Sequence, residues 1–102
     1  VRLIEAPKEN MRIIQRRILR EILDRVPVHE AAHGCVRGRS VVSNARLHST
    51  SPLLLKLDLQ DFFISIPAAR VHALFRTLGY PQETARYLTG LSTHSTPARW
   101  LL

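Results

Sequence analysis

The sequence predicts an α+β fold in which short β-strands are packed by three or four α-helices. Residues 11–26 and 67–78 carry apolar side chains at helical spacing, which is typical of helices that cover a core with one face, and Pro81 opens a further helix that runs roughly to Leu91. Residues 53–57 form a short apolar run, long enough for a buried strand and too short for a helix. Apolar and charged residues alternate loosely over residues 2–6, which predicts a second strand.

The longest predicted helix spans residues 11–26, with Asn10 as its cap. Gln15 lies among the apolar residues of its buried face, and a buried amide requires hydrogen-bond partners. We therefore expect Gln15 to bond to the backbone of a neighbouring segment. The other side carries oppositely charged residues four apart, which support a helix slightly and leave most of the arginines in solvent. These pairs are Arg17–Glu21, Arg20–Asp24 and Glu21–Arg25.

The remaining helices have clear start and stop residues. Ser40 is expected to cap a short helix that runs to about Leu47. Pro67 and Pro81 mark the starts of the last two helices, and Gly79 ends the first of them. Because the sequence has no internal repeat, low-complexity segment or linker, we expect one structural unit over residues 1–102.

The composition indicates a small basic protein with a polyanionic partner. The chain has 102 residues, and its 15 basic side chains, thirteen of them Arg, outnumber 8 acidic ones. The planar guanidinium group suits phosphate oxygens, so an Arg-rich chain favours nucleic acid as its partner. Cys35 is the single cysteine, which excludes an internal disulfide and fits the cytoplasm. Neither a signal peptide nor a membrane-spanning run is visible, so no membrane partner is expected.

The two ends of the sequence lead us to expect a piece of a longer protein. The first residue is Val1 rather than Met, and the last three residues are apolar with no polar tail.

Residues 53–66 carry the first candidate site. The apolar run ends near Asp58, Asp61 follows three residues later, and Phe62 and Phe63 come next. A carboxylate at the end of a buried strand is held at the edge of a sheet, where it is well placed to bind Mg²⁺ together with substrate phosphates. The alternative is that Asp58 only caps the turn after the strand. Because neighbours on an extended chain point in opposite directions, we expect one of the two Phe rings to lie in the core.

The segment Gly34-Cys-Val-Arg-Gly-Arg-Ser40 is the second candidate site. Glycine lets the backbone approach a phosphate closely, and Arg37 and Arg39 supply positive charge. Ser40 opens a helix whose N-terminus favours anions. The segment lacks the Gly-Lys-Ser/Thr ending of a phosphate-binding P-loop, and a plain surface turn is the alternative.

The segment His29-Glu30-Ala31-Ala32-His33 matches the H-E-x-x-H pattern of zinc peptidases. Such a site requires a helix that turns both His side chains to one face. Pro27 lies two residues before the segment and Gly34 directly after it, so there is room for barely one or two turns. We therefore expect His29 and His33 to serve loop structure, and a zinc peptidase is the remote alternative.

Three motifs together resemble the bacterial retron-type and group II intron reverse transcriptases. Leu-Asp58-Leu-Gln-Asp-Phe-Phe resembles the first catalytic motif of that family. His33-Gly-x-x-x-Gly-Arg-Ser40, followed by Asn44 and His48, resembles a fingers motif, with Cys35 where the family more often has Phe. Arg2-x-Ile-x-x-Pro7 and the later Ile14-Gln-Arg16 are similar to the first fingers motif. The resemblance covers essentially the whole chain.

The resemblance implies a partial fingers–palm fold, with a fingers-like segment over residues 1–52 and the start of the palm over residues 53–102. It implies that Asp58, with the Leu59 backbone, binds metal and that Phe63 lies under the nucleotide sugar and excludes a 2′-hydroxyl. The backbone around Leu59, Asp61 and Phe62 would meet the metal and the triphosphate. Arg2 would touch the triphosphate. The segment with Arg37, Arg39 and Ser40 would help to clamp template and nucleotide.

The implied function is the amino-terminal part of an RNA-directed DNA polymerase that uses Mg²⁺ in a two-metal mechanism. Its partners would be an RNA template, a DNA or RNA primer and deoxynucleoside triphosphates. The family also uses a paired Asp hairpin, which this sequence lacks, so we expect the isolated chain to be inactive. The alternative function is a non-catalytic, Arg-rich nucleic-acid-binding module.

Overall fold

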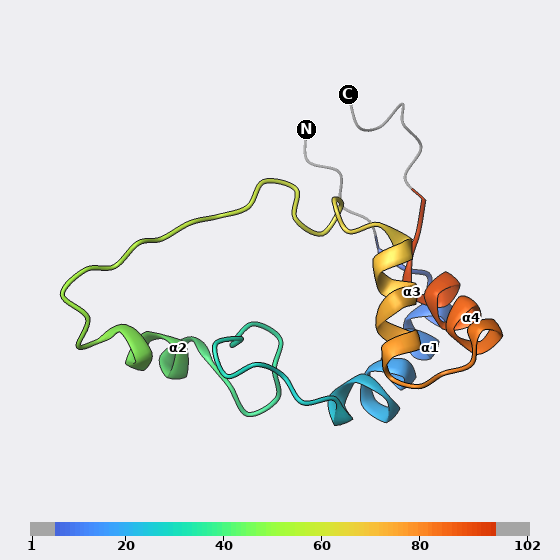
Figure 1. The fold of residues 1–102 in the computed structure, drawn as a ribbon, viewed down its shortest axis with the longest axis horizontal. Helices are drawn as coiled ribbons and strands as arrows, with labels where there is room; N and C mark the ends of the chain where they lie inside the picture. The colour runs from blue at the N-terminus through green and yellow to red at the C-terminus, as the bar shows by residue number, and fades with distance from the viewer. Residues whose placement is uncertain (1–5, 96–102) are drawn as a thin grey trace.

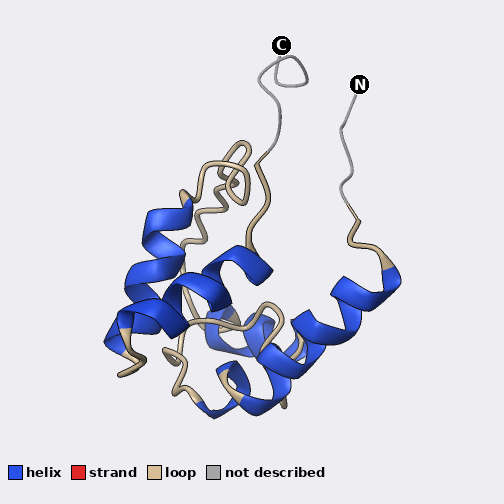
Figure 2. Ribbon diagram, turned by 90° about the vertical axis from the view of Figure 1, so that its right-hand side faces the viewer, coloured by secondary structure: helices blue, strands red, loops and turns tan. Residues whose placement is uncertain are grey.

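In the computed structural model, which describes residues 6–95, the chain forms four α-helices and one short 3₁₀ helix (Figure 1). The elements are α1 (Glu9–Glu21), η1 (Leu23–Arg25), α2 (Val41–His48), α3 (Ala68–Thr77) and α4 (Gln82–Ser92). Helices α1, α3 and α4 pack together, whereas α2 and the chain on either side of it extend away from them. Coloured by secondary structure, residues 6–95 contain helices and loops but no strand (Figure 2).

The prediction of an α+β fold with short strands is therefore wrong for the part of the chain that the structure describes. Residues 53–57 are not helical, but no second segment among residues 6–95 pairs with them, and Leu53 is 84% exposed. A β-strand exists only when its N–H and C=O groups bond to a neighbouring strand. The strand predicted near residues 2–6 falls outside the described residues, except for Ala6, which is in a loop.

The core lies between α1, α3 and α4 and is centred on Phe75, which is 1% exposed. Ile18 from α1 and Ala85 from α4 are buried beside it. The small Ala85 side chain allows α4 to approach α3 closely. Partly buried apolar residues surround this centre: Ile22, Leu23, Val71, Leu78, Tyr80, Leu88 and Leu91. Helical spacing of such residues predicted α1 and α3, whereas α4 was predicted from Pro81, and burying these side chains stabilises the packing.

One polar contact ties α1 to α4. The Nε2 atom of Gln15 donates a hydrogen bond of 2.9 Å to the carbonyl oxygen of Leu91. The prediction that this amide bonds to the backbone of a neighbouring segment is thus confirmed. A buried amide without that partner would destabilise the interface by about 1–3 kcal/mol.

The end of α3 is a Schellman motif that fixes the turn into α4. Gly79 has a φ of 95°, in the left-handed region that only glycine adopts without strain. The Tyr80 N–H donates to the Phe75 carbonyl at 3.2 Å, and the Gly79 N–H donates to the Arg76 carbonyl at 3.0 Å. The rings of Tyr80 and Phe75 also meet edge to face, with centroids 6.3 Å apart. The motif thus joins a helix stop to the packing of the core.

The helix predictions differ from the structure mainly at α1. Helices α2, α3 and α4 lie within one residue of the predicted bounds, and Ser40 caps α2 as predicted. The predicted helix over residues 11–26 is α1 followed by the 3₁₀ turn η1. Asn10 is not its cap, since α1 begins at Glu9 and its N-cap, Lys8, makes no side-chain capping bond.

The described chain is less compact than a typical domain of its length. Its radius of gyration is 16.6 Å, whereas about 13 Å is typical for 100 residues. The difference reflects α2 and the long chain that leads from it to α3 (Figure 1). Within residues 6–95, no helix combines the length and the apolar character that crossing a membrane requires.

We predict that Gly79→Ala lowers the free energy of unfolding by about 1–2 kcal/mol, because alanine is strained in the left-handed region. The cost is one of backbone conformation rather than crowding, since no atom lies within 4 Å of the position that a Cβ would take. Gly90→Ala in α4 is the matched control, because a Cβ there would also meet no atom within 4 Å and the backbone is helical. This variant should raise the free energy of unfolding by up to about 1 kcal/mol. Urea unfolding of both variants measures this, and equal shifts would contradict the account.

Candidate functional site

Asp58 lies in an exposed, non-helical stretch of chain. Its carboxylate is open to solvent and has no hydrogen bond or ion pair with any of residues 6–95. Leu57 and Leu59 on either side are also exposed. The carboxylate is therefore available to a ligand rather than engaged in capping a turn.

The chain turns directly after Gln60. Asp61 has a φ of 51°, a left-handed conformation that Asp tolerates better than most residues. The Ser65 N–H donates to the Asp61 carbonyl at 2.9 Å, and the Ser65 hydroxyl donates to the Phe62 carbonyl at 2.7 Å. These bonds close a tight turn that carries both aromatic rings.

Phe62 and Phe63 pack against each other in this turn. Their ring centroids are 5.5 Å apart and the ring planes meet at 66°, an edge-to-face arrangement. Phe62 is 48% exposed and Phe63 is 83% exposed. The expectation that one ring lies in the core is therefore wrong. The turn presents an aromatic surface four to five residues after the Asp58 carboxylate.

This segment has oxygen donors of the type that a hard cation prefers, but it has too few of them for a complete site. Mg²⁺ is usually bound by one or two carboxylates together with water and substrate phosphates. Asp58 offers a carboxylate, and Leu59 offers a backbone carbonyl. Among residues 6–95, however, no three His, Cys, Asp or Glu side chains lie close enough together to hold a metal ion. The described part of this segment therefore offers one carboxylate and one carbonyl, which is fewer oxygen donors than a complete metal site requires.

The loop before α2 is organised by Arg39. Its Nη1 atom donates to the carbonyl oxygens of His29 at 2.6 Å, of Glu30 at 3.1 Å, and of Ala32. Its Nη2 atom reaches the Val28 carbonyl at 3.5 Å. The loop has few bonds of its own, so one guanidinium satisfies backbone groups that would otherwise depend on water. The charge of Arg39, the glycines beside it and the resemblance to a fingers motif had suggested contact with template and nucleotide. The signal for its loop role was the shortage of hydrogen-bond donors near these carbonyls.

Ser40 and His33 complete the entry to α2. The Ser40 hydroxyl accepts from the Ser43 N–H at 3.2 Å, and the Ser43 hydroxyl accepts from the Ser40 N–H at 2.8 Å, which forms a capping box. The Ser43 hydroxyl also donates to the Ser40 carbonyl at 2.8 Å and lies 2.9 Å from His33 Nδ1. Since that hydroxyl has a single proton, His33 serves as the donor in the last contact.

The H-E-x-x-H segment does not form a peptidase site in this structure. It is a loop with a turn rather than a helix, so its two His side chains do not share a helix face. His29 Nδ1 accepts a hydrogen bond of 3.2 Å from the Ala31 N–H, and His33 bonds to Ser43. The expectation that both residues serve loop structure is confirmed.

The two candidate sites are separate in the described structure. One site is the loop just before α2, which contains Arg37 and Arg39. The other is the turn just before α3, which contains Phe62, and the two segments lie well apart in the ribbon view (Figure 1). Arg37 is exposed and has no hydrogen bond or ion pair with residues 6–95. Arg2 lies outside the described residues.

Comparison with known proteins gives several retron reverse transcriptases as relatives. Over 94 residues, 92% of this chain, the sequence is 42% identical to the retron Mx162 reverse transcriptase of Myxococcus xanthus. It is 44% identical over 95 residues to the retron Mx65 reverse transcriptase of the same organism, and 33% identical over 89 residues to the retron Ec86 reverse transcriptase of Escherichia coli. No family model and no solved structure matches the chain.

The chain spans only part of these relatives. It covers 19% of the Mx162 enzyme, 22% of the Mx65 enzyme and 28% of the Ec86 enzyme. The resemblance predicted by the three motifs is nevertheless confirmed over about nine tenths of the chain. The chain is thus related to the retron reverse transcriptases and corresponds to a segment of such an enzyme.

Proposed function

We propose that residues 1–102 are the amino-terminal part of an RNA-directed DNA polymerase, with a fingers-like segment over 1–52 and the start of the palm over 53–102. The observation that carries the proposal is the exposed Asp58 carboxylate beside an aromatic turn, in a chain 42–44% identical to two retron reverse transcriptases. The complete enzyme would act in the cytoplasm on an RNA template, a DNA or RNA primer and deoxynucleoside triphosphates.

In this proposal Asp58 and the Leu59 carbonyl are two of the ligands of catalytic Mg²⁺, and the other ligands come from the rest of the enzyme and from substrate phosphates. When bound, the metal would stabilise the charge that develops on the phosphate oxygens during nucleotidyl transfer. The exposure of Asp58 supports this role, because the carboxylate keeps all its oxygen lone pairs for a ligand.

The turn after Asp58 would bind the nucleotide. Phe63 is 83% exposed, which leaves its ring accessible for contact with a sugar that lacks a 2′-hydroxyl. The backbone at Asp61 and Phe62 would lie near the triphosphate, and Arg2 would contribute charge to it. Phe62 packs edge-on against Phe63 and so limits the positions of that ring.

The loop before α2 would contact template and nucleotide. Of the two arginines in this loop, Arg37 has no partner among residues 6–95 and could bind phosphate. Ser40 caps α2, and the N-terminus of a helix favours anions. Arg39 would act mainly by holding the loop through the carbonyls of residues 28–32, so that Arg37 is presented to phosphate.

We predict that Asp58→Asn abolishes polymerisation when these residues replace the matching segment of the Mx65 enzyme. Loss of a metal-ligating carboxylate should reduce primer extension by about 100-fold or more. The matched control is Asp61→Asn, because Asp61 is assigned a backbone role and its side chain should be dispensable. Template-primer binding should survive in both variants. Extension by the Asp58→Asn chimera at the rate of its parent would refute the role of Asp58.

The isolated 102-residue chain is expected to show no polymerase activity, because its described carboxylates do not form a metal site by themselves. This favours nucleic-acid binding without chemistry as the second candidate function, for the chain alone. The measurement is extension of a labelled primer on an RNA template with Mg²⁺ and deoxynucleotides. Incorporation above a no-protein blank that is lost with Asp58→Asn would contradict the expectation.

We further predict that Arg39→Gln loosens the loop over residues 28–40. Loss of its charged hydrogen bonds should raise the local opening of the loop by about tenfold, since each such bond contributes about 1.5 kcal/mol or more. Limited proteolysis with mapped cleavage sites measures this opening. Arg37→Gln is the control, because Arg37 has the same charge and no partner among residues 6–95. Equal cleavage of the two variants would remove the role assigned to Arg39.

A further inference from the structure

Arg12, Arg16 and Arg20 recur every four residues of α1 and form a stripe along it. An α-helix rises about 1.5 Å per residue, so neighbouring members are about 6 Å apart and the stripe is about 12 Å long. At about 100° per residue, Arg16 lies about 160° around the helix axis from the buried Ile18. The stripe is therefore on the side of α1 opposite the core, and its three side chains are exposed.

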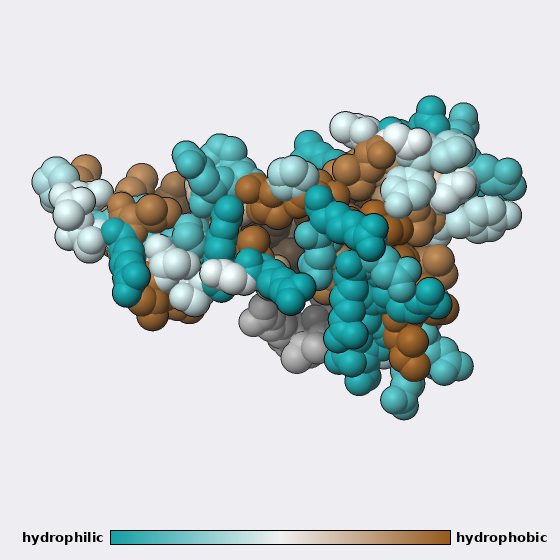
Figure 3. Space-filling view, turned by 90° about the horizontal axis from the view of Figure 1, so that it is seen from below, coloured by the Kyte–Doolittle hydropathy of each residue, from teal (hydrophilic) through white to brown (hydrophobic). Residues whose placement is uncertain are grey.

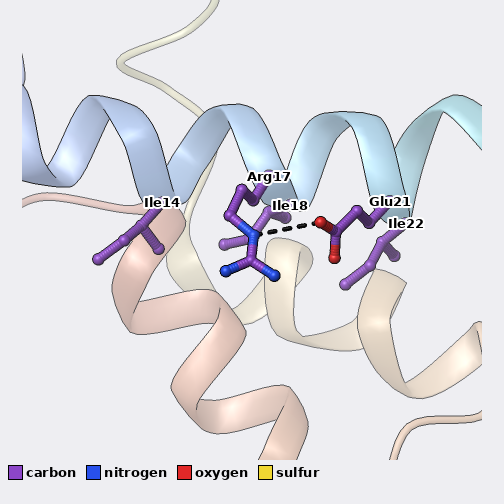
Figure 4. Close-up of a pocket in the computed structure, with 5 residues that line it drawn as sticks. All are labelled: Ile14, Arg17, Ile18, Glu21 and Ile22. Carbon is purple, nitrogen blue, oxygen red and sulfur yellow. Dashed lines mark hydrogen bonds and ion pairs between the residues drawn. The ribbon is translucent and has the colours of Figure 1, made fainter.

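Within residues 6–95, no acidic side chain pairs with the stripe. Glu21 is already bound to Arg17, with Nε and Oε1 3.1 Å apart, beside a shallow cavity on another side of the helix (Figure 4). The pair predicted between Arg20 and Asp24 is absent, because α1 ends at Glu21 and the chain continues as a 3₁₀ turn.

The stripe is thus a concentration of unpaired positive charge. Lys8, four residues before Arg12, extends it by one position at the start of the helix, and Glu9 is the acidic residue of the first turn. Arg12 and Glu9 form no ion pair. Like charges about 6 Å apart repel one another, and an anionic partner with similarly spaced charges would relieve that repulsion.

The spacing suits a nucleic-acid strand. Each strand of a duplex offers one phosphate per 3.4 Å or so of axis, so a stripe of about 12 Å faces about three or four phosphates. Guanidinium groups bind phosphate oxygens with two parallel hydrogen bonds. A membrane surface fits less well, because an interfacial helix inserts its apolar face, and Ile18 on the apolar side of α1 is already buried in the core with Phe75 and Ala85. On the face of the molecule seen in Figure 3, hydrophilic and hydrophobic surface are interleaved.

We propose that Arg12, Arg16 and Arg20 form a contact surface for the phosphate backbone of a nucleic-acid strand. The inference rests on the proposed function for the class of partner, and adds a surface that lies outside residues 53–66 and the loop before α2. The contacts are to phosphates, so binding depends on salt and not on base sequence.

The test compares two triple variants of the 102-residue chain with equal change in net charge. Arg12→Gln, Arg16→Gln and Arg20→Gln remove the stripe, whereas Arg70→Gln, Arg76→Gln and Arg86→Gln remove three exposed arginines of α3 and α4. Glutamine is nearly as good a helix former as arginine, and circular dichroism checks that both variants stay folded. The probe is a fluorescein-labelled oligouridylate of about 20 nucleotides, titrated between about 50 and 200 mM salt.

We expect loss of the stripe to reduce the slope of log K against log salt by about 2, which is about 0.7 for each of three phosphate contacts. Affinity at low salt should fall by about tenfold or more, and the control triple should keep nearly the slope of the parent chain. Substituting Lys at the three stripe positions should preserve the slope, because the charge remains.

Equal slopes for the two triple variants would overturn the inference, as would absence of RNA binding by the parent chain at low salt. Binding to vesicles that contain phosphatidylserine, without binding to the oligouridylate, would assign the stripe to membranes and also overturn it. None of these readouts involves catalysis. The RNA-binding test can therefore refute the stripe while loss of primer extension in the Asp58→Asn chimera still supports the proposed function, and primer extension by that chimera can refute the proposed function while the stripe still binds RNA.

Discussion

The burial of Phe75 between three helices is the contact on which the described fold depends. Ile18 reaches it from α1 and Ala85 from α4, and the turn at Gly79 brings the Tyr80 ring against its edge. Complete burial of such a side chain contributes about 1.5–3 kcal/mol, a large share of the stability of a small core. Gln15 and Leu91 add a hydrogen bond that fixes α1 against α4. The core therefore joins a helix from the first half of the chain to two helices from the second half.

Local patterns in the sequence placed α2, α3 and α4 and most of α1, but they were insufficient for the ends of α1 and for the strand. Apolar spacing, a capping serine and the glycine after α3 act over a few residues, and each was interpreted correctly from its neighbours alone. The sequence also predicted that Gln15 bonds to the backbone of another segment, because an amide on the apolar side of a helix requires a hydrogen-bond partner. The run at residues 53–57 differs, since an extended segment becomes a strand only if another segment pairs with it. Hydrophobicity does not supply that partner, and the described chain leaves these residues exposed.

The candidate sites show the same limit. Asp58, Phe62 and Phe63 were identified from their order in the sequence, and the structure adds that all three are exposed and that the two rings pack together. Arg39 was assigned to template and nucleotide on its charge, its Gly-containing segment and the resemblance to a fingers motif, and that assignment stays a prediction. The backbone of a loop with few hydrogen bonds of its own also offers acceptors, and four carbonyls of residues 28–32 bond to the guanidinium in the described structure. Which acceptor an arginine finds depends on how the loop folds, and residue type does not determine that.

The central claim is that Asp58 binds the catalytic metal of a reverse transcriptase. Its most direct measurement replaces Mg²⁺ by Fe²⁺ in the Mx65 chimera and maps, by mass spectrometry, where ascorbate and peroxide cleave the backbone beside the bound iron. The account predicts cleavage next to Asp58 and through the Phe62–Phe63 turn. Cleavage confined to other segments in a chimera that still extends primers would contradict it.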